Sequence, residues 1–447
     1  MKKTALLFIM GAGILFPLAF WADSFSQSQA LGLYIYNTGR LWALAGFLLL
    51  LYQYILSSKI KWLERGIGLD RLFIIHRTCG AAALVLIILH PVFIFVSMPL
   101  QGFGLPITPL VAVGVNAAVI LAVTAGAALL YRALRLKYET WKNIHRASYV
   151  LLPLVFFHSF FLGSSTRVQP IRSYWLFLGA LFLYVLIHRT LAWLHIRKHS
   201  FFVSEVKQET SDTWSVFFKG RQISYKPGQF MIVRLIRNRK VSEPHPFTIS
   251  SSPAREALSI TVKSVGDFTS AIGKTTILDR AYIDAPYGIF SFLNYNAPVL
   301  VFISGGIGIT PFMSMLRYMR DRKMERRVLL IWGNKTEADI TFRKELDQIA
   351  LEMPLLKVVH VMSSQESWQG EKGLVNTELL RKYISGSTPA LPRAAAPHTA
   401  VPHAEAQYTS AQYFLCGPPP MMNGVLRSLK QLGIPKSRVH DERFSLR

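Results

Sequence analysis

Long apolar runs in the first 195 residues constrain this 447-residue chain more than any other feature of its sequence. A helix crosses the hydrocarbon core of a bilayer with about 20 mainly apolar residues. Six runs come close to that length, at residues 4–21, 39–57, 73–98, 108–131, 147–163 and 172–194. Residues 200–447 instead alternate short apolar runs with Gly, Pro and charge, as soluble α/β domains do. The sequence therefore predicts a membrane-embedded half followed by a soluble half.

The composition agrees with a membrane protein. The chain is 51% hydrophobic and only 17% charged, which is too apolar for an ordinary soluble protein. Its net charge of +25 could suggest nucleic-acid binding, but no nucleic-acid motif accompanies it. Lys and Arg cluster in loops between the apolar runs, where positive-inside topology and anionic lipid headgroups explain part of the excess. We therefore expect a lipid bilayer, and no nucleic acid, as partner.

The basic loops predict the orientation of the spans. Loop 58–72 carries four Lys or Arg and loop 132–146 carries five, whereas 99–109 carries no charge. The two basic loops, and with them the soluble half, are expected on the cytoplasmic side of a bacterial-type inner membrane. The opening residues 1–20 also resemble a signal peptide, but their apolar stretch is long for one. A retained first helix is the favoured interpretation.

Four histidines lie within the third and fifth spans. His76 and His90 are 14 residues apart, and His145 and His158 are 13 apart, which is about 20 Å along a helix. Both spans run outward, so facing imidazoles can form pairs at two levels, and each pair can hold one haem iron. Interhelical hydrogen bonding is the alternative. Two matched pairs favour haem.

The second pair does not fit a straight helix. A 14-residue step returns to within about 40° of the starting face, whereas a 13-residue step leaves two side chains roughly 140° apart. Pro153 lies between His145 and His158 and can kink a helix or change its winding. We therefore predict an irregularity near Pro153.

Six spans with His-x13-His on the third and His-x12-His on the fifth resemble the ferric reductase and NADPH oxidase superfamily, whose membrane domain carries two stacked bis-histidine b-type haems. The resemblance implies that His76 pairs with His145 around an inner haem and His90 with His158 around an outer haem. The eukaryotic oxidases have a further histidine one turn beyond the outer ligand of the third helix, where this chain has Ile94. The acceptor, O2 giving superoxide or a ferric chelate, therefore stays open.

Arg40 lies at the outer end of the second span. Its charge could attract an anionic product or bind a haem propionate. Interfacial snorkelling of the guanidinium is the alternative.

Residues 200–296 contain short strands separated by turns, including "YKPGQFMIVRLI", "HPFTISSSP" and "LSITVKSVGDFTSAI". This pattern predicts a small antiparallel barrel. Hydroxyls and backbone amides of "HPFTISS" could bind a flavin ring and its ribityl chain. Lys263, with the small residues Gly266, Thr269 and Ser270, suits a pyrophosphate.

From residue 297 the pattern changes to a buried strand "PVLVFIS", a turn "GGIGITP" and an amphipathic helix "FMSMLRYM". Thr310 is a candidate N-cap, with Pro311 at the first helical position. Such a unit presents free amides and the positive helix end to a dinucleotide phosphate. Further strands at "RVLLIW", "LKVVHVM" and "AQYFLC" predict an open parallel sheet. Residues 384–412, rich in Ala and Pro, are expected to form a mobile insertion.

The order of "HPFTISS", "GGIGITPF", "CGPPPMM" and "DERF" resembles the ferredoxin–NADP reductase-like dehydrogenase module over nearly all of 200–447. The resemblance implies that FAD contacts His245, Pro246, Phe247, Thr248, Ser250 and Ser251. It also implies that the nicotinamide nucleotide contacts Gly305, Gly306, Gly308, Thr310, Cys416, Gly417 and Pro418.

The same resemblance gives candidate catalytic residues. Phe444 corresponds to the near-terminal aromatic that stacks on the flavin, and Cys416 lies near the nicotinamide, although a small buried hydrophobe at a strand end is its alternative role. Lys335 follows the second strand, where a cation can meet the 2′-phosphate of NADPH. Lys lacks the bidentate fork of Arg, so NADPH is favoured over NADH only slightly.

The sequence thus predicts a multidomain membrane protein. A six-helix α-bundle at 1–196 with two b-type haems precedes an antiparallel β-barrel FAD domain at 200–296 and an α/β Rossmann-like NAD(P)H domain at 297–447. The expected function is transmembrane electron transfer from cytosolic NAD(P)H through FAD and haem to an extracytoplasmic acceptor, as in NADPH oxidases and ferric-chelate reductases. A membrane-anchored flavin reductase without haem and a non-catalytic membrane binding protein are the alternatives. The sequence does not identify a partner protein.

Overall fold

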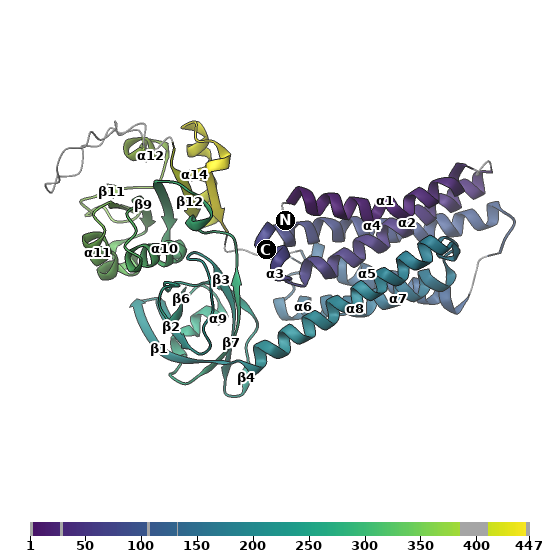
Figure 1. The fold of residues 1–447 in the computed structure, drawn as a ribbon, viewed down its shortest axis with the longest axis horizontal. Coiled ribbons are helices and arrows are strands. Elements are labelled where there is room, and N and C mark those ends of the chain that lie inside the picture. Colours follow the sequence, from purple (N-terminus) through teal and green to yellow (C-terminus); the bar gives the residue numbers. More distant parts are fainter. Residues whose placement is uncertain (1–2, 27–29, 105–107, 132, 385–409, 444–447) are drawn as a thin grey trace. The chain divides into compact units, whose positions relative to one another are not determined.

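The computed structural model describes residues 3–26, 30–104, 108–131, 133–384 and 410–443. It divides into two compact units, Met1–Trp193 and Leu194–Arg447, whose elements are labelled in Figure 1. Phe444 and most of the expected 384–412 insertion lie outside the described residues.

The membrane unit is helical. Its elements are α1 (Lys3–Ser26), α2 (Leu31–Ser57), α3 (Lys61–Ile67), α4 (Leu69–Leu100), α5 (Pro109–Leu129), α6 (Tyr138–Arg146), α7 (Ser148–Leu162) and α8 (Gln169–Lys198). With α6 and α7 counted as one segment, the described residues contain six helices long and apolar enough to cross a membrane. A helix satisfies its own backbone hydrogen bonds, which hydrocarbon cannot do. The six predicted spans are confirmed.

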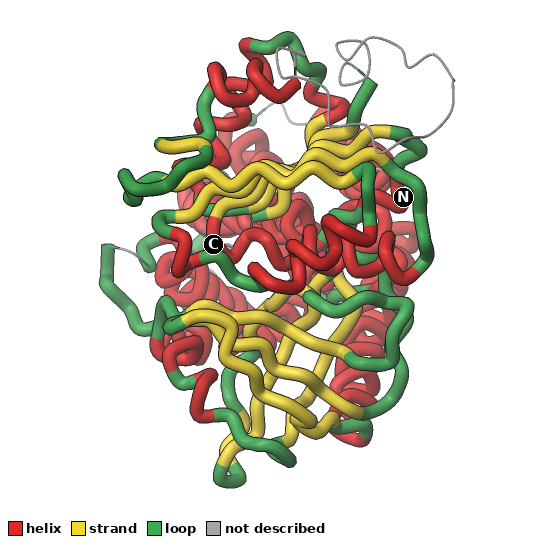
Figure 2. The backbone as a smooth tube through the Cα atoms, turned by 90° about the vertical axis from the view of Figure 1, so that its left-hand side faces the viewer, coloured by secondary structure: helices red, strands yellow, loops and turns green. Residues whose placement is uncertain are grey.

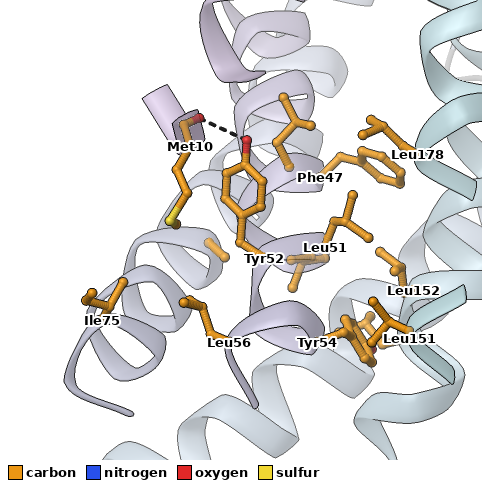
Figure 3. Close-up of a cluster of buried hydrophobic side chains, with 14 of the residues drawn as sticks. Met10, Phe47, Leu51, Tyr52, Tyr54, Leu56, Ile75, Leu151, Leu152 and Leu178 are labelled. Atoms are coloured by element: carbon orange, nitrogen blue, oxygen red, sulfur yellow. Dashed lines mark hydrogen bonds between the residues drawn. The ribbon is translucent and has the colours of Figure 1, made fainter. Parts of the chain in front are cut away.

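Aromatic and aliphatic side chains pack between these helices (Figure 3). Phe47 of α2 stacks on Trp175 of α8 with ring centres 4.9 Å apart. The Tyr52 hydroxyl donates to the carbonyl of Met10 in α1 at 2.9 Å. Helix α4 lies mainly along α2, and α7 lies mainly along α5. The two histidine-bearing segments therefore belong to different helix pairs.

The predicted irregularity is present, but its expected position at Pro153 is wrong. Helix α6 ends at Arg146, α7 begins at Ser148, and Pro153 lies inside continuous α7. The amide of Ala147 donates to Ile144 at 3.0 Å, and the amide of Val150 donates to Ala147 at 3.1 Å. These three-residue hydrogen bonds wind the chain more tightly than an α-helix. The tighter winding lies between His145 and His158, as the 13-residue step requires.

The soluble unit begins with an antiparallel barrel, drawn among the yellow strands of Figure 2. Its strands are β1 (Phe201–Thr210), β2 (Thr213–Lys219), β3 (Phe230–Arg237), β4 (Lys240–Val241), β5 (His245–Thr248), β6 (Leu258–Lys263) and β7 (Arg280–Tyr287). The order is β4-β3-β7-β1-β2-β6, and β5 pairs with β3. A bridge between Ile249 and Ile260 joins the remaining edges. The predicted barrel is confirmed.

A parallel sheet follows, with strands β8 (Val299–Gly305), β9 (Arg327–Asn334), β10 (Leu356–Met362), β11 (Glu371–Lys372), β12 (Gln412–Cys416) and β13 (Val439–Glu442). Their order is β11-β10-β9-β8-β12-β13. One face packs on α10 (Thr310–Asp321) and α11 (Arg343–Glu352), and the other on α12 (Thr377–Ile384) and α14 (Pro419–Gln431). This is the predicted doubly wound α/β domain.

Helix α10 binds the barrel to the sheet. Arg317 donates to the carbonyl of Ser250 at 2.5 Å and forms a bidentate pair with Glu345 of α11. Ser314 donates to the carbonyl of Ser251 at 2.7 Å. The segment "HPFTISS" is thus held from the side of the nucleotide domain.

We predict that Arg317→Met lowers the free energy of unfolding of the soluble unit by about 2 kcal/mol, because Glu345 and the Ser250 carbonyl lose a charged donor. A guanidinium titration followed by tryptophan fluorescence measures the change. The control is Arg322→Met at the end of the same helix, where the guanidinium is exposed and lies over the Tyr318 ring. Equal stability of the two variants would contradict the prediction.

The same pair predicts a pH dependence. Partial burial alone would raise the pKa of Glu345, but the hydrogen bonds and charge of Arg317 outweigh it and lower that pKa below its ordinary value of 4.5. The pair therefore stabilises the fold fully above pH 4.5, and this contribution is lost as the pH falls through the lowered pKa. Arg317→Met should lose part of the stability difference between pH 7 and pH 4 that the parent shows.

Candidate functional site

The structure brings the four histidines of the membrane unit together in the two expected pairs. The ring centres of His76 and His145 are 6.2 Å apart, and those of His90 and His158 are 6.4 Å apart. Two imidazole nitrogens at about 2 Å from one metal ion place the ring centres roughly 6 Å apart. Each pair therefore has the separation of two axial ligands on one iron.

Backbone carbonyls orient three of the four rings. The Nδ1 atoms of His76, His90 and His158 lie 3.3, 3.0 and 2.7 Å from the carbonyl oxygens of Gln53, Gly39 and Leu110. Such a bond fixes Nδ1 as the donor and leaves Nε2 free to bind a metal.

The fourth ring is held differently. The Nδ1 atom of His145 is buried and makes no hydrogen bond of normal geometry among the described residues. The backbone of Thr124 lies close to this ring. The ring of His145 stacks on Trp141, one turn earlier in α6, with ring centres 5.5 Å apart. Stacking therefore orients this histidine.

The surroundings of the pairs fit haem better than a bare metal ion. Within the described residues, no cluster of three or more His, Cys, Asp or Glu side chains is placed to hold a metal. A Cβ atom at Gly114 of α5 would lie 2.5 Å from the His158 ring. Glycine therefore makes the space that this ring occupies. The residues present fit two bis-histidine haems.

Arg40 lies in the third turn of α2, because the helix begins at Leu31, earlier than the predicted span at residue 39. Its guanidinium donates to the Ser165 hydroxyl from Nε at 3.2 Å and from Nη2 at 2.7 Å, and Nη1 donates to Asn37 at 2.7 Å. Ser165 and Asn37 are both buried. This arrangement differs from simple snorkelling, because protein groups bind the guanidinium.

The barrel brings the two expected flavin motifs side by side. His245 of β5 stacks on Phe268 of α9 (Asp267–Ser270) with ring centres 3.9 Å apart, and Phe247 lies beside the same ring. Thr269 accepts from the amide of Gly266 at 2.8 Å. A cavity of about 330 Å³ lies next to Phe268, lined also by the β3–β4 hairpin.

Other expected flavin residues have structural partners. The Ser250 hydroxyl is bonded to Ser259 and Thr261 inside the barrel, and the Ser251 hydroxyl lies 2.9 Å from that of Tyr225. Both serines are buried. Their hydroxyls therefore shape the segment, while His245, Pro246 and Phe247 remain partly exposed on β5 and Thr248 ends it inside the barrel.

Lys263 contacts Asp212 at 3.2 Å and Asp339 at 3.3 Å. Partial burial alone would lower the pKa of Lys263, but the hydrogen bonds and charges of these two carboxylates outweigh it and raise that pKa. Lys263 therefore stays a cation, as a pyrophosphate ligand must. Ser270 is uncharged, and its hydroxyl accepts a hydrogen bond from the hydroxyl of Ser264.

The expected nucleotide residues meet at the switch point of the parallel sheet. Strands β9 and β10 lie on one side of β8, and β12 and β13 lie on the other, and ligands of such sheets bind at the carboxyl ends of the strands where the order reverses. The turn after β8 contains Gly305, Gly306 and Gly308, and the segment after β12 contains Gly417 and Pro418. These two segments are in contact.

Glycine is required for that contact. A Cβ atom on Gly308 would lie 2.4 Å from the carbonyl oxygen of Cys416, and one on Gly305 would lie 2.2 Å from the sulfur of Met421. Gly306 has φ +51°, which favours glycine. Thr310 is already helical at φ −56° and does not cap α10, so the expected N-cap is wrong. The 3-10 turn Gly306–Ile309 before it displaces the helix start.

Cys416 is the last residue of β12, and Lys335 directly follows β9. Strand β8 lies between these two strands in the sheet. Complete burial, together with the charges of Glu442 and Asp441, raises the pKa of the Cys416 thiol well above its ordinary value. The thiol therefore stays protonated and packs in the sheet core. Lys335 is exposed directly after β9.

Sequence reasoning missed three residues that shape these sites. Phe268 stacks on His245, Trp141 stacks on His145, and the indole of Trp332 donates to the carbonyl of Gly306 at 3.0 Å. The aromatic residue inside "GDFT", directly before Thr269, was a usable signal for the first. Trp332 comes from the second strand and lies beside the glycine turn only because β8 and β9 are parallel neighbours.

Three family models match successive parts of the chain. A ferric reductase like transmembrane component matches residues 42–156, an FAD-binding domain matches 199–305, and an oxidoreductase NAD-binding domain matches 302–427. The fold and these matches define a multi-pass transmembrane oxidoreductase with FAD- and NAD-binding domains. The chain belongs to the ferric reductase and NADPH oxidase type, in which a ferric reductase-like transmembrane domain is fused to a ferredoxin–NADP reductase-like module.

Individual relatives resemble part of the chain. A glycine betaine monooxygenase reductase subunit of Chromohalobacter salexigens is 29% identical over 55% of this chain and 64% of its own length. The ferredoxin reductase component of the 3-ketosteroid-9-alpha-monooxygenase of Rhodococcus rhodochrous is 30% identical over 54% and 64%. A flavohemoglobin structure from Malassezia yamatoensis aligns over 91% of this chain and 97% of its own at 20% identity, with a TM-score of 0.47. The chain spans 64% of the length of each of the two reductases, which is less than two thirds.

We predict that Gly308→Ala weakens NAD(P)H binding at least tenfold, because the new methyl group meets backbone rather than a movable side chain. Anaerobic stopped-flow reduction of bound FAD at several NAD(P)H concentrations measures the change. The control is Gly424→Ala in α14, where nothing lies within 4 Å of the added Cβ. Parent-like nucleotide binding by Gly308→Ala would show that the contact between the two segments is dispensable.

Proposed function

We propose that this protein transfers electrons from NAD(P)H on one side of a bilayer to an acceptor on the other side. The observation that carries the proposal is the presence of two histidine pairs in a unit made of membrane-spanning helices. The ring centres are 6.2 Å apart in one pair and 6.4 Å apart in the other. When bound, FAD accepts a hydride and releases single electrons, which haem iron can carry.

His76 with His145, and His90 with His158, would hold the two b-type haems. Three carbonyl hydrogen bonds and one aromatic stack hold the rings. An iron ligated by two histidines would suit electron transfer rather than substrate binding at the metal. The protein's contribution is therefore fixed ligand geometry.

In the soluble unit, His245 to Thr248 with Phe268 would bind FAD, and Lys263 with Gly266, Thr269 and Ser270 would hold its pyrophosphate. The glycine turn after β8, Thr310 and the Cys416–Pro418 segment would bind NAD(P)H. Cys416 would contribute by contact near the nicotinamide, since its thiol stays protonated. Phe444 would cover the flavin face.

The basic loops 58–72 and 132–146 support a cytoplasmic location for the soluble unit, in a bacterial-type inner membrane. The acceptor side is then extracytoplasmic. O2, giving superoxide, and a ferric chelate are the two proposed acceptors. Ile94, where eukaryotic oxidases have histidine, lowers support for a dedicated O2 site. Arg40, held by Ser165 and Asn37, would supply a fixed cation for an anionic product or chelate.

We predict that the parent protein binds two haems per chain and that His90→Leu/His158→Leu binds one. The pyridine haemochrome assay on purified protein counts them. His76→Leu/His145→Leu should likewise lose one haem, and the control His195→Leu, on an exposed histidine at the end of α8, should keep two. Parent protein with FAD but no haem would instead establish a membrane-anchored flavin reductase. Superoxide and ferric reduction, assayed separately, then identify the acceptor.

We predict that Lys335→Ala raises KM for NADPH roughly tenfold, because a phosphate loses a charged donor, while KM for NADH changes little. The control Lys344→Ala removes an exposed charge from α11 and should change neither constant. Steady-state oxidation of each nucleotide by the parent and both variants gives the six KM values. Equal effects of Lys335→Ala on both nucleotides would exclude a contact with the 2′-phosphate.

A further inference from the structure

One end of the barrel carries an exposed row of side chains. Val241, Ile236, Arg280, Phe202 and Lys219 lie opposite one another on strands β4, β3, β7, β1 and β2. Directly paired residues point to the same face of a sheet. Phe202 and Val241 are 44% and 48% exposed, so this is the outer face. We call these five residues the barrel-end row; β4 and β7, two of its strands, are labelled next to each other in Figure 1.

An apolar loop adjoins the barrel-end row. Ile277 and Leu278 are 64% and 73% exposed, and Leu278 has φ +75°, a conformation that is unusual for a bulky residue. The amide of Leu278 donates to the carbonyl of Val203 at 2.9 Å. That bond places the loop beside Phe202. Strained backbone that presents an apolar side chain to solvent indicates a functional surface.

Basic residues surround this apolar surface. Arg239, Lys240 and Lys274 are exposed, and the Arg280 guanidinium lies over the Phe202 ring at 5.3 Å. The nearby carboxylate of Asp279 accepts from the amide of Thr276 at 2.9 Å. Cations around exposed aliphatic side chains are typical of surfaces that bind anionic lipid.

Chain continuity places this surface near a membrane. Helix α8 ends at Lys198, and Phe202 follows four residues later. The last residues of α8, from Leu194, belong to the same compact unit as the barrel. Arg221 contacts His195 in α8 at 3.1 Å, and Arg280 donates to Ser200 at 2.6 Å. The barrel-end row is therefore fixed beside the end of a membrane-spanning helix.

We propose that the barrel-end row and the Ile277–Leu278 loop bind the surface of an anionic bilayer, with the aliphatic side chains among the acyl chains and the cations at the headgroups. Such insertion reaches about 5–10 Å into the boundary between headgroups and acyl chains. The contact would hold the dehydrogenase module against the membrane by a second attachment besides α8. It does not depend on haem or on the identity of the acceptor.

The test uses the full chain in nanodiscs. Ile277→Cys carries an environment-sensitive fluorophore in a Cys79→Ala background, because Cys416 is fully buried. Lipids brominated at upper acyl carbons should quench this probe severalfold more than a probe at Leu351→Cys, a 79% exposed site on the nucleotide domain. Replacing brominated phosphatidylglycerol with brominated phosphatidylcholine should reduce the quenching. The double substitution Arg239→Gln/Lys240→Gln should also reduce the quenching by brominated phosphatidylglycerol.

Three outcomes overturn the proposal. Equal quenching at both sites shows that the loop does not enter lipid. A blue-shifted probe without bromine quenching shows that protein, the membrane unit of the same chain or a second copy, covers the loop. Quenching that is unchanged by lipid charge and by Arg239→Gln/Lys240→Gln shows that the cations take no part. Haem and FAD content of each labelled variant, measured in parallel, reports on the proposed function separately.

Discussion

Orientation of imidazole rings by backbone carbonyls is the interaction on which the membrane unit depends. A polar ring in hydrocarbon must satisfy its nitrogen within the protein, and here the partners are carbonyls of Gln53, Gly39 and Leu110. Those carbonyls lie on α2 and near the start of α5, the helices that pack along α4 and α7. Close packing within each helix pair therefore sets the orientation of these three rings on their own helices.

Glycines permit that packing. A Cβ atom on Gly46 of α2 would lie 2.7 Å from Ile87 of α4, and one on Gly114 of α5 would lie 2.5 Å from His158. Small residues let membrane helices approach closely. The carbonyls of α2 and α5 can reach the histidines only because these backbones are near. The apolar character of the spans thus explains insertion, while glycine and carbonyl positions explain the site.

The sequence predicted the features that depend on spacing along one element. The matching histidine spacings on the third and fifth spans indicated paired imidazoles, and the strand patterns and the glycine turn indicated the barrel and the parallel sheet. Pro153 was the obvious candidate for an irregularity, but membrane helices tolerate proline when neighbouring groups satisfy the freed carbonyl. The change in winding falls instead at Ala147, between α6 and α7, where no residue type signals it.

Interactions between distant segments could not be predicted. Asp212 and Asp339 approach Lys263 from the barrel and from the loop after β9, and Arg317 reaches Ser250 across 67 residues. An anion that reaches Lys263 must displace or share its two carboxylates, so part of the Coulombic gain is already present in the protein. A single lysine therefore contributes less to pyrophosphate affinity than its charge suggests. The amides of Val265 and Gly266 are engaged as well, because both donate to the Thr269 hydroxyl, at 2.9 and 2.8 Å.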